Sequence, residues 1–214
     1  MLYRKFLTQT LEEASKIANQ MFGKVTGTIK AHDPRQVLTE ADGEIGKFII
    51  QKIQKDYPDH NIIDEEAGVI NKKSEFAWVI DPIDGTVNFA HGSFLYGIMI
   101  GLLRNSIPVA GGIALPAFNG IDIAEKGQGA FSNGERIHVK DLDQASSHII
   151  SFKLAGEPGD LVFNEKQAKF EAAVATEFIH MHSSGSVYDT VMFAKGIYSG
   201  ELNLTSKVWD NIAQ

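Results

Sequence analysis

The sequence predicts a layered α+β fold, and changes of pattern along the chain support this prediction. Near the N-terminus, apolar residues recur at spacings of three and four, which is typical of amphipathic helices. From residue 76 onward the spacing becomes two, which is typical of strands. Towards the C-terminus, short strand-like and helix-like segments alternate. This order of elements indicates helices packed on sheets in layers.

The first part of the chain predicts two helices, a loop and a strand. Residues 2–22 carry a helical apolar stripe that ends at Gly23. A second helix begins near Thr39 and stops before Pro58, because the residue that precedes a proline avoids helical geometry. The other two predicted elements are a loop over 23–38, which has glycine, proline and charge without a period, and a strand over 61–63.

The remainder of the chain predicts a block of strands and then an alternating region. Residues 132–135, Ser-Asn-Gly-Glu, are typical of a tight turn between two strands. The predicted strands cover residues 76–80, 94–103, 109–115, 121–125, 148–152, 180–182 and 197–202, and the predicted helices lie around 170–178 and over 186–195.

Length and composition bound the class of protein. The 214 residues are enough to bury a sizeable core, and hydrophobic and charged contents of 43% and 22% are ordinary for a globular protein. No stretch approaches the ~20 apolar residues of a membrane span, and the N-terminal segment lacks the uninterrupted apolar run of a signal peptide. We therefore expect a cytoplasmic protein without a membrane partner. A net charge of −7 without a basic block argues against a nucleic-acid partner.

The chain has no cysteine. This excludes disulfides, thiolate nucleophiles and cysteine-based zinc sites, so oxygen atoms or histidines must hold any metal ion.

Acidic residues gather at the ends of predicted elements. Each group has a structural explanation: an aspartate can oppose a helix dipole, a Glu-Glu pair can lie in a solvated loop, and Asp-Pro-Ile-Asp-Gly can form a turn. Together, however, carboxylates at one edge of a sheet repel one another unless cations neutralise them, and hard oxygen ligands suit Mg²⁺. The acidic residues concerned are Asp42, Glu65, Glu66, Asp81, Asp84 and Asp210.

Residues 81–86, Asp-Pro-Ile-Asp-Gly-Thr, have the composition of a metal and phosphate site. Pro82 turns the chain, which allows the two aspartates and the Ile83 carbonyl to face the same ions. Gly85 and Thr86 then offer backbone N–H groups at a helix start, where a phosphate can bind. The hydroxyl of Thr86 can orient a water molecule beside the metal.

This stretch resembles the signature of the inositol monophosphatase family. Residues 78–89, WVIDPIDGTVNF, match the family pattern W-x-[IV]-D-P-[IL]-D-G-T-x-N-[FY] throughout. Further matches follow in the family's order, namely Thr39-x-x-Asp42, Glu65-Glu66, the glycine-rich run 127–134 and Trp209-Asp210.

The resemblance implies an αβαβα sandwich of the inositol monophosphatase and fructose-1,6-bisphosphatase type. Residues 1–214 would form a single domain, with an N-terminal α+β subdomain over 1–140 that holds the metal site. A C-terminal α/β subdomain would cover 141–214. Relatives continue with another strand and helix after the Trp-Asp pair, so we expect this chain to lack the last strand-helix segment of the fold.

The resemblance also assigns roles to residues. Glu65, Asp81, Asp84 and the Ile83 carbonyl would ligate Mg²⁺, and Asp210 would complete a second site, for two or three ions in total. Asp42, Thr86 and Glu65 would position and deprotonate the attacking water, while Glu66 would support them. The substrate-binding set implied by the family is Asp84, Gly85, Thr86, Ser186, Val187, Asn203 and Asp210. The implied activity is Mg²⁺-dependent, lithium-sensitive hydrolysis of a small phosphate monoester by a homodimer.

Three positions depart from the family pattern and leave the substrate open. Asp64 replaces a common glycine, Val187 is bulkier than the usual alanine, and Asn203 stands where animal enzymes carry a glutamate that binds inositol. Inositol-1-phosphate-type monoesters are the first expectation. The alternatives are NADP 2′-phosphate, a sugar phosphate or fructose-1,6-bisphosphate, or a non-catalytic, transcription-associated binding role on the same fold.

Overall fold

The computed structural model describes residues 2–30, 33–139, 149–153, 160–178, 180–203 and 207–213, with the side chains of 29, 30, 33–37 and 153 excepted. The chain divides into two compact units. The first comprises residues 1–136 together with 207–214, and the second comprises residues 137–206. The break near 137 lies close to the predicted boundary at 140, but residues 207–214 group with the first unit rather than the second. Among the described residues, no helix combines the length and apolar character that crossing a membrane requires.

The first unit is built on an eight-stranded sheet with the order β10-β9-β8-β7-β6-β5-β3-β4. Strands β3 and β5 are parallel, and the other pairs that join β4 to β9 are antiparallel. The strands are β3 (Asn61–Asp64), β4 (Gly68–Ile70), β5 (Phe76–Asp84), β6 (Gly97–Arg104), β7 (Ile107–Leu115), β8 (Gly120–Glu125), β9 (Gly129–Ser132) and β10 (Glu135–Ile137).

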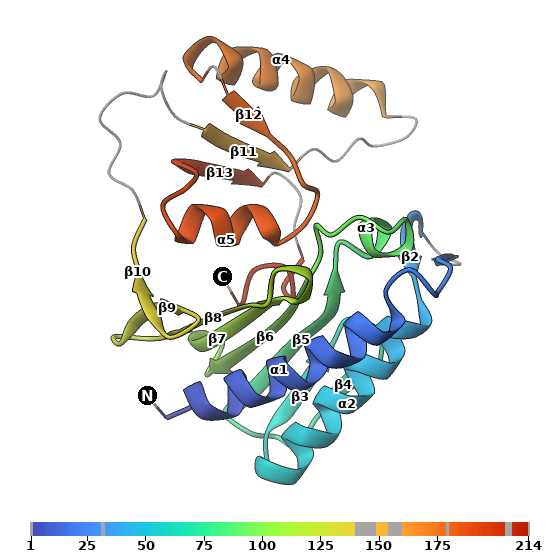
Figure 1. Ribbon diagram of the computed structural model, residues 1–214, viewed down its shortest axis with the longest axis vertical. Helices are drawn as coiled ribbons and strands as arrows, with labels where there is room; N and C mark the ends of the chain where they lie inside the picture. Colours follow the sequence, from blue (N-terminus) through green and yellow to red (C-terminus); the bar gives the residue numbers. More distant parts are fainter. Residues whose placement is uncertain are drawn as a thin grey trace. The chain divides into compact units, whose positions relative to one another are not determined.

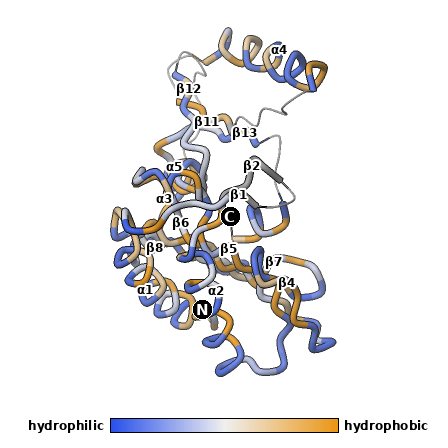
Figure 2. Tube along the Cα trace, turned by 90° about the vertical axis from the view of Figure 1, so that its right-hand side faces the viewer, coloured by the Kyte–Doolittle hydropathy of each residue, from blue (hydrophilic) through white to orange (hydrophobic). Residues whose placement is uncertain are grey.

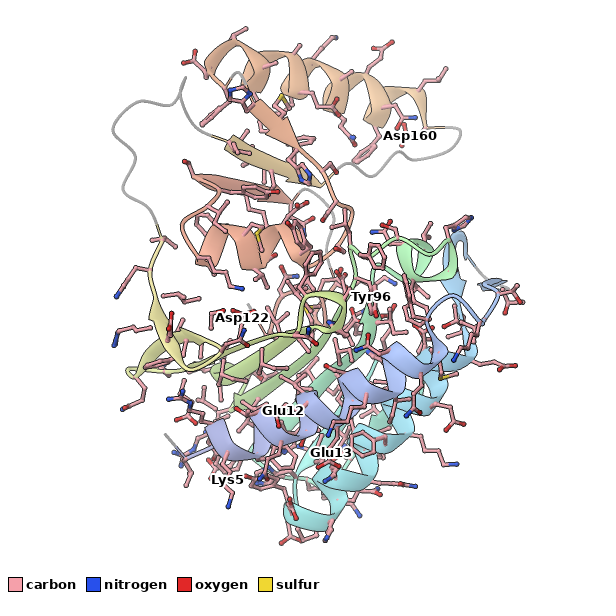
Figure 3. The ribbon with its side chains drawn as sticks, viewed as in Figure 1. Lys5, Glu12, Glu13, Tyr96, Asp122 and Asp160 are labelled. Carbon is pink, nitrogen blue, oxygen red and sulfur yellow. The ribbon has the colours of Figure 1, made fainter. Side chains whose placement is uncertain are left out.

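Two long helices lie side by side across one face of this sheet (Figure 1). They are α1 (Arg4–Met21) and α2 (Glu40–Asp56), close to the predicted ranges. Their apolar stripes bury side chains such as Leu11 and Ile49 against Ile80 and Ile100 of the sheet. Lys52 of α2 reaches Glu13 of α1, labelled in Figure 3, at 2.8 Å. The periodic sequence thus produces the predicted helical layer.

The predicted loop over 23–38 is partly wrong, because it contains the antiparallel pair β1 (Thr28–Lys30) and β2 (Asp33–Leu38). Within the part of the chain that the structure describes, these strands form a separate two-stranded sheet. Their backbone hydrogen bonds require no alternation of apolar residues, so the sequence pattern did not reveal them. The short strands β4, β9 and β10 escaped prediction for the same reason. The turn at 132–135 is confirmed, with positive φ at Asn133 (46°) and Gly134 (91°).

The second unit contains a three-stranded parallel sheet with the order β12-β11-β13. Asp160 caps α4 by accepting a hydrogen bond from the Phe163 N–H at 2.9 Å, and Figure 3 labels it. Hydrophobic and hydrophilic residues follow each other within each turn of α4 (Figure 2), and none of its residues is fully buried. The elements are β11 (Ile149–Lys153), α4 (Leu161–Glu177), β12 (His180–His182), α5 (Tyr188–Ala194) and β13 (Gly200–Asn203).

His60 makes the stability of the first unit depend on pH. Its ring stacks between Tyr57 and Phe76, with centroid distances of 5.1 and 4.7 Å. Its Nδ1 accepts a hydrogen bond from the Trp78 indole N–H at 3.1 Å. This bond requires that Nδ1 carries no proton, so the imidazole ring must be neutral. Burial lowers the pKa of His60 below its ordinary value of 6.5, and the charge of Asp59 opposes this only in part.

We therefore expect acid to destabilise the protein through His60. Because the folded-state pKa is lowered, the unfolded chain takes up this proton first. The stabilising contribution is complete above pH 6.5 and is lost as the pH falls towards the folded-state pKa. Urea denaturation at pH 7.5 and pH 5.5 should show a smaller loss in His60→Phe than in the wild type. Equal losses in both proteins would contradict this expectation.

Candidate active site

A bulge in β5 brings two aspartates to the same face of the sheet. In a regular strand, residues three apart point to opposite faces. Here, Asp81 pairs with Met99 and Asp84 with Gly97, so β5 advances three residues while β6 advances two. Pro82, which cannot donate to the ladder, lies within this irregularity. The sequence expectation that the proline lets both aspartates serve one site is thus explained by the bulge, and β5 continues through Asp84 rather than ending at residue 80.

Asp210 reaches the same face by a different route. Gly101 and Gly111 are cross-strand partners on β6 and β7, and Gly101 pairs in turn with Val79, two residues before Asp81. A Cβ on Gly111 would lie 2.7 Å from the Ala213 carbonyl oxygen, and one on Gly101 would lie 3.0 Å from the Ile212 carbonyl carbon. Ile212 and Ala213 therefore pack on a strip of sheet without side chains. This contact places Asp210 beside β5.

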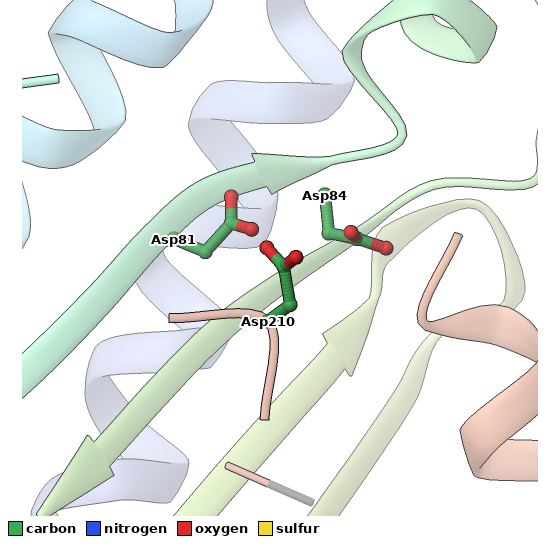
Figure 4. A group of neighbouring side chains, drawn as sticks. All are labelled: Asp81, Asp84 and Asp210. Atoms are coloured by element: carbon green, nitrogen blue, oxygen red, sulfur yellow. The ribbon is translucent and has the colours of Figure 1, made fainter. Parts of the chain in front are cut away.

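The three aspartates form a compact carboxylate cluster (Figure 4). One oxygen from each of Asp81, Asp84 and Asp210 lies within 4.8 Å of the others. Asp81 and Asp84 are only 2% and 7% exposed. Oδ1 of Asp81 is buried without a hydrogen-bond partner in the described part of the chain.

The carboxylates of this cluster repel one another. Burial raises the pKa of Asp81 well above its ordinary value, and repulsion from Asp84, Glu65 and Asp210 raises it further. A divalent cation would ligate the orphaned oxygen and cancel the repulsion. The side-chain donors are all carboxylates, which suit Mg²⁺. The residues present therefore fit the metal that the sequence predicted.

Glu65 lies in the hairpin loop between β3 and β4. Its backbone N–H donates to the Ile80 carbonyl at 3.1 Å, which continues the β3–β5 pairing and ties this residue to the strand that carries Asp81. One carboxylate oxygen lies 3.8 Å from the Lys207 ammonium, and Asp210 accepts a hydrogen bond from the Lys207 N–H at 2.8 Å. Lys207 thus connects two predicted ligands from distant parts of the sequence.

Asp42 and Thr86 form the predicted pair. Asp42 is 1% exposed, and its Oδ2 accepts hydrogen bonds from the Thr39 N–H (2.8 Å) and hydroxyl (2.6 Å). Its Oδ1 lies 3.2 Å from the Thr86 hydroxyl, which also lies 2.8 Å from the Ile83 carbonyl. Burial raises the pKa of Asp42, and the hydrogen bonds from Thr39 oppose that shift. Asp42 therefore does more than face a helix dipole: both of its oxygens are engaged.

Gly85 allows the chain to turn from β5 into α3 (Thr86–Ala90). Its φ of 85° lies in the left-handed region, where residues with a side chain are strained. This turn places Thr86 next to Asp84, where its hydroxyl can reach both the Ile83 carbonyl and Asp42. The predicted helix start is confirmed, although α3 is only five residues long.

A model of the inositol monophosphatase family matches residues 3–213. This chain belongs to that family. It is 30% identical over 202 residues to a fructose-1,6-bisphosphatase/inositol-1-monophosphatase of Aquifex aeolicus, covering 91% of this chain and 74% of the relative. It is 37% identical over 136 residues to the protein of the same name from Thermotoga maritima, covering 64% of this chain but only 52% of that relative. The extragenic suppressor protein SuhB of Bartonella henselae superposes with a TM-score of 0.88 at 25% identity, over 100% of this chain and 82% of that one.

Family membership confirms the predicted α+β class, because the large mixed sheet and its helices match the relatives' structures. The remaining predicted residues of this inositol monophosphatase family member lie in the second unit. Ser186 and Val187 are buried at the start of α5, and the Ser186 hydroxyl accepts a hydrogen bond from the Tyr188 N–H at 3.2 Å. Asn203 ends β13. Their part in binding a substrate stays a prediction.

Three residues that shape the site could not be assigned to it from the sequence. Lys207 carries no local signal, because its link to Glu65 joins residues 142 positions apart. Gly101 and Gly111 lie inside the predicted strands 94–103 and 109–115. A glycine in the middle of a strand signals that another backbone approaches closely, and this signal was available.

The glycine strip yields a testable expectation. Gly111→Ala places a Cβ against the backbone of Ala213 and so displaces the segment that carries Asp210. We expect phosphate release to fall about tenfold and the Mg²⁺ concentration for half-maximal activity to rise. Gly120→Ala is the matched control, since its Cβ would meet nothing closer than 3.5 Å. Unchanged Mg²⁺ dependence in Gly111→Ala would show that the strip does not position Asp210.

Proposed function

We propose that this chain is a Mg²⁺-dependent phosphatase that hydrolyses a small phosphate monoester of the inositol-1-phosphate type. The observation that carries the proposal is the cluster of buried Asp81 and Asp84 with half-buried Asp210, supported by Glu65 and by the Asp42–Thr86 pair. Family membership supports phosphatase activity in general. The substrate and the metal are our inference from the site.

Two or three Mg²⁺ ions would be held by Glu65, Asp81, Asp84, Asp210 and the Ile83 carbonyl. When bound, Mg²⁺ lowers the pKa of a coordinated water and stabilises negative charge on the departing oxygen. The buried walls around Asp81 keep these interactions strong by excluding bulk water.

The residues around Thr86 move the proton. Its hydroxyl has one hydrogen and can donate it to Asp42 Oδ1, which leaves a lone pair of Oγ to accept a hydrogen bond from the attacking water. As the water attacks phosphorus, its proton passes to Thr86 Oγ while the hydroxyl hydrogen passes to Asp42. The hydrogen bonds from Thr39 hold the Asp42 carboxylate in place for this transfer. The bond from phosphorus to the alcohol oxygen breaks on the opposite side, without a phospho-enzyme.

A phosphate-release screen tests the proposal. It should compare inositol phosphates, NADP, sugar phosphates including fructose-1,6-bisphosphate, and adenosine 3′,5′-bisphosphate, with Mg²⁺ and with a chelator. We expect release that requires Mg²⁺, is fastest for an inositol monophosphate and is inhibited by Li⁺. Release from no monoester would favour the non-catalytic binding role instead. Light scattering of the same sample tests the proposed homodimer.

A further inference from the structure

The loop that carries Glu65 and Glu66 is held by a buried carboxylate. Asp64 ends β3 and pairs with Gly68 of β4, so residues 65–67 form the loop of a tight hairpin. Oδ1 of Asp64 accepts hydrogen bonds from the backbone N–H groups of Glu66 (2.9 Å) and Ala67 (2.6 Å). A side chain that accepts from residues two and three positions ahead fixes the loop's conformation.

The other carboxylate oxygen, Oδ2, lies close to the backbone of α2 at Gly46. A Cβ built on Gly46 would lie 3.0 Å from Asp64 Oδ2 and 3.2 Å from Pro82 Cγ. A side chain at Gly46 would therefore press on both neighbours, and three segments meet at this glycine. These segments are the hairpin with Glu65, the helix that carries Asp42 one turn earlier, and the bulge that carries Asp81 and Asp84.

Burial of Asp64 needs a reason. It is 2% exposed, and burying a carboxylate near other acidic residues opposes folding unless hydrogen bonds compensate. Its placement is explained if the two N–H bonds are required to set the loop. A cavity of about 440 Å³ lies beside this contact and is lined by Gly43, Gly46, Asp64 and Glu66 among others, so neighbouring side chains do not pack the loop tightly from that side.

We propose that Asp64 is a positioning residue, which acts with Gly46 to set the metal-binding hairpin against α2 and the β5 bulge. The inference rests on the proposed function for its effect on catalysis. Its structural part, that Asp64 fixes the loop and thereby the affinity for Mg²⁺, can be measured without a substrate.

The first test distinguishes the role of Asp64 as a hydrogen-bond acceptor from the effect of its negative charge. Asp64→Ala removes the acceptor, so we expect the Mg²⁺ concentration for half-maximal activity to rise about tenfold, with a similar fall in kcat. Amide hydrogen exchange at Glu66 and Ala67, followed by NMR, should accelerate at least about tenfold because both N–H groups lose their partner. Asp64→Asn keeps the oxygen but not the charge, and we expect it to restore most of the slow exchange and of the Mg²⁺ affinity.

The second test changes Gly46, the α2 residue that faces Asp64. Gly46→Ala is expected to raise the Mg²⁺ concentration for half-maximal activity, as Asp64→Ala does, because the added Cβ pushes on Asp64 and Pro82. Gly43→Ala is the matched control in the same helix, since its Cβ would have no neighbour within 4 Å. If Asp64→Ala fails to fold, Gly46→Ala and Asp64→Asn decide the matter.

Three results would overturn the proposal. They are unchanged amide exchange in Asp64→Ala, a loss in Asp64→Asn as large as in Asp64→Ala, and normal Mg²⁺ dependence in Gly46→Ala. Calorimetric measurement of Mg²⁺ binding distinguishes a failure of the Asp64 proposal from a failure of the proposed phosphatase function. A wild type that releases no phosphate defeats the proposed function, whereas the calorimetric and exchange differences among the variants still test Asp64.

Discussion

Asp84→Asn is expected to reduce phosphate release by about 10³-fold or more, equivalent to about 4 kcal/mol of lost transition-state stabilisation. Asparagine keeps the shape of the side chain but removes a negative charge from a cluster whose three ligand oxygens lie within 4.8 Å of one another. The site then loses both a ligand oxygen and part of the charge that attracts Mg²⁺. Phosphate release at saturating Mg²⁺ and calorimetric titration with Mg²⁺ should both report the loss.

The same substitution is expected to stabilise the metal-free protein. Asp84 is the first charged neighbour that raises the pKa of Asp81, after burial itself. A carboxyl group whose folded-state pKa is raised opposes folding at every pH above its unfolded value, and this cost grows as the pH rises towards the folded pKa. Removing the Asp84 charge reduces the cost, so the Tm in a chelator should rise at pH 7. Mg²⁺ should stabilise the wild type more than the variant.

Asp122→Asn is the matched control for this experiment. Asp122 is a carboxylate of the same sheet with the same 7% exposure as Asp84, but it lies outside the cluster of ligands. Its replacement should leave the Mg²⁺ dependence within about threefold of the wild type. If Asp84→Asn retained activity, or if both variants lost Mg²⁺ affinity equally, the cluster could not be the metal site.

The chemistry of the site could be predicted from the sequence because its central part is local. Asp81, Asp84 and Thr86 lie within six residues, and the proline and glycine between them have backbone requirements that can be stated without a structure. The capping pattern of Thr39 and Asp42 is equally local, since the two residues lie one helical turn apart. Each of these groups is brought together by the geometry of a single turn or bulge.

The assembly of these groups could not be predicted in the same way. Asp210 reaches Asp81 because residues 212 and 213 pack on Gly101 and Gly111, about 100 positions earlier in the chain. Contacts of this kind depend on the finished sheet, and no spacing in the sequence encodes them. The hydrogen bonds of Asp64 are local, but its packing on Gly46 joins a strand end to a helix. The missed strands β1 and β2 reflect a related limit, because their pairing depends on backbone groups rather than on a side-chain pattern.

Thr86→Ala is expected to lower kcat by about 10²- to 10³-fold while the Mg²⁺ concentration for half-maximal activity changes less than about threefold. The hydroxyl lies between Asp42 Oδ1 and the Ile83 carbonyl, so its removal breaks the path from the attacking water to Asp42. The carboxylate cluster itself stays intact. Steady-state kinetics at several Mg²⁺ concentrations separate these effects, and they distinguish a proton-transfer defect from the metal-binding defect of Asp84→Asn.

Two companion variants make the result specific. Thr86→Ser keeps the hydroxyl and should recover kcat to within about tenfold of the wild type. Val87→Ala changes the adjacent α3 residue, which is 47% exposed, and should leave the kinetics unaltered. A shift in Mg²⁺ dependence in Thr86→Ala as large as that in Asp84→Asn would assign the hydroxyl to metal binding instead.

A double-mutant cycle tests whether Thr86 and Asp42 act as a unit. If the proton passes from water through Thr86 to Asp42, then Asp42→Asn alone already interrupts the transfer. Adding Thr86→Ala should then cost little more, so that the two losses are far from additive. Additive losses would mean that the two residues contribute separately, and that the 3.2 Å contact between them is not the route of the proton.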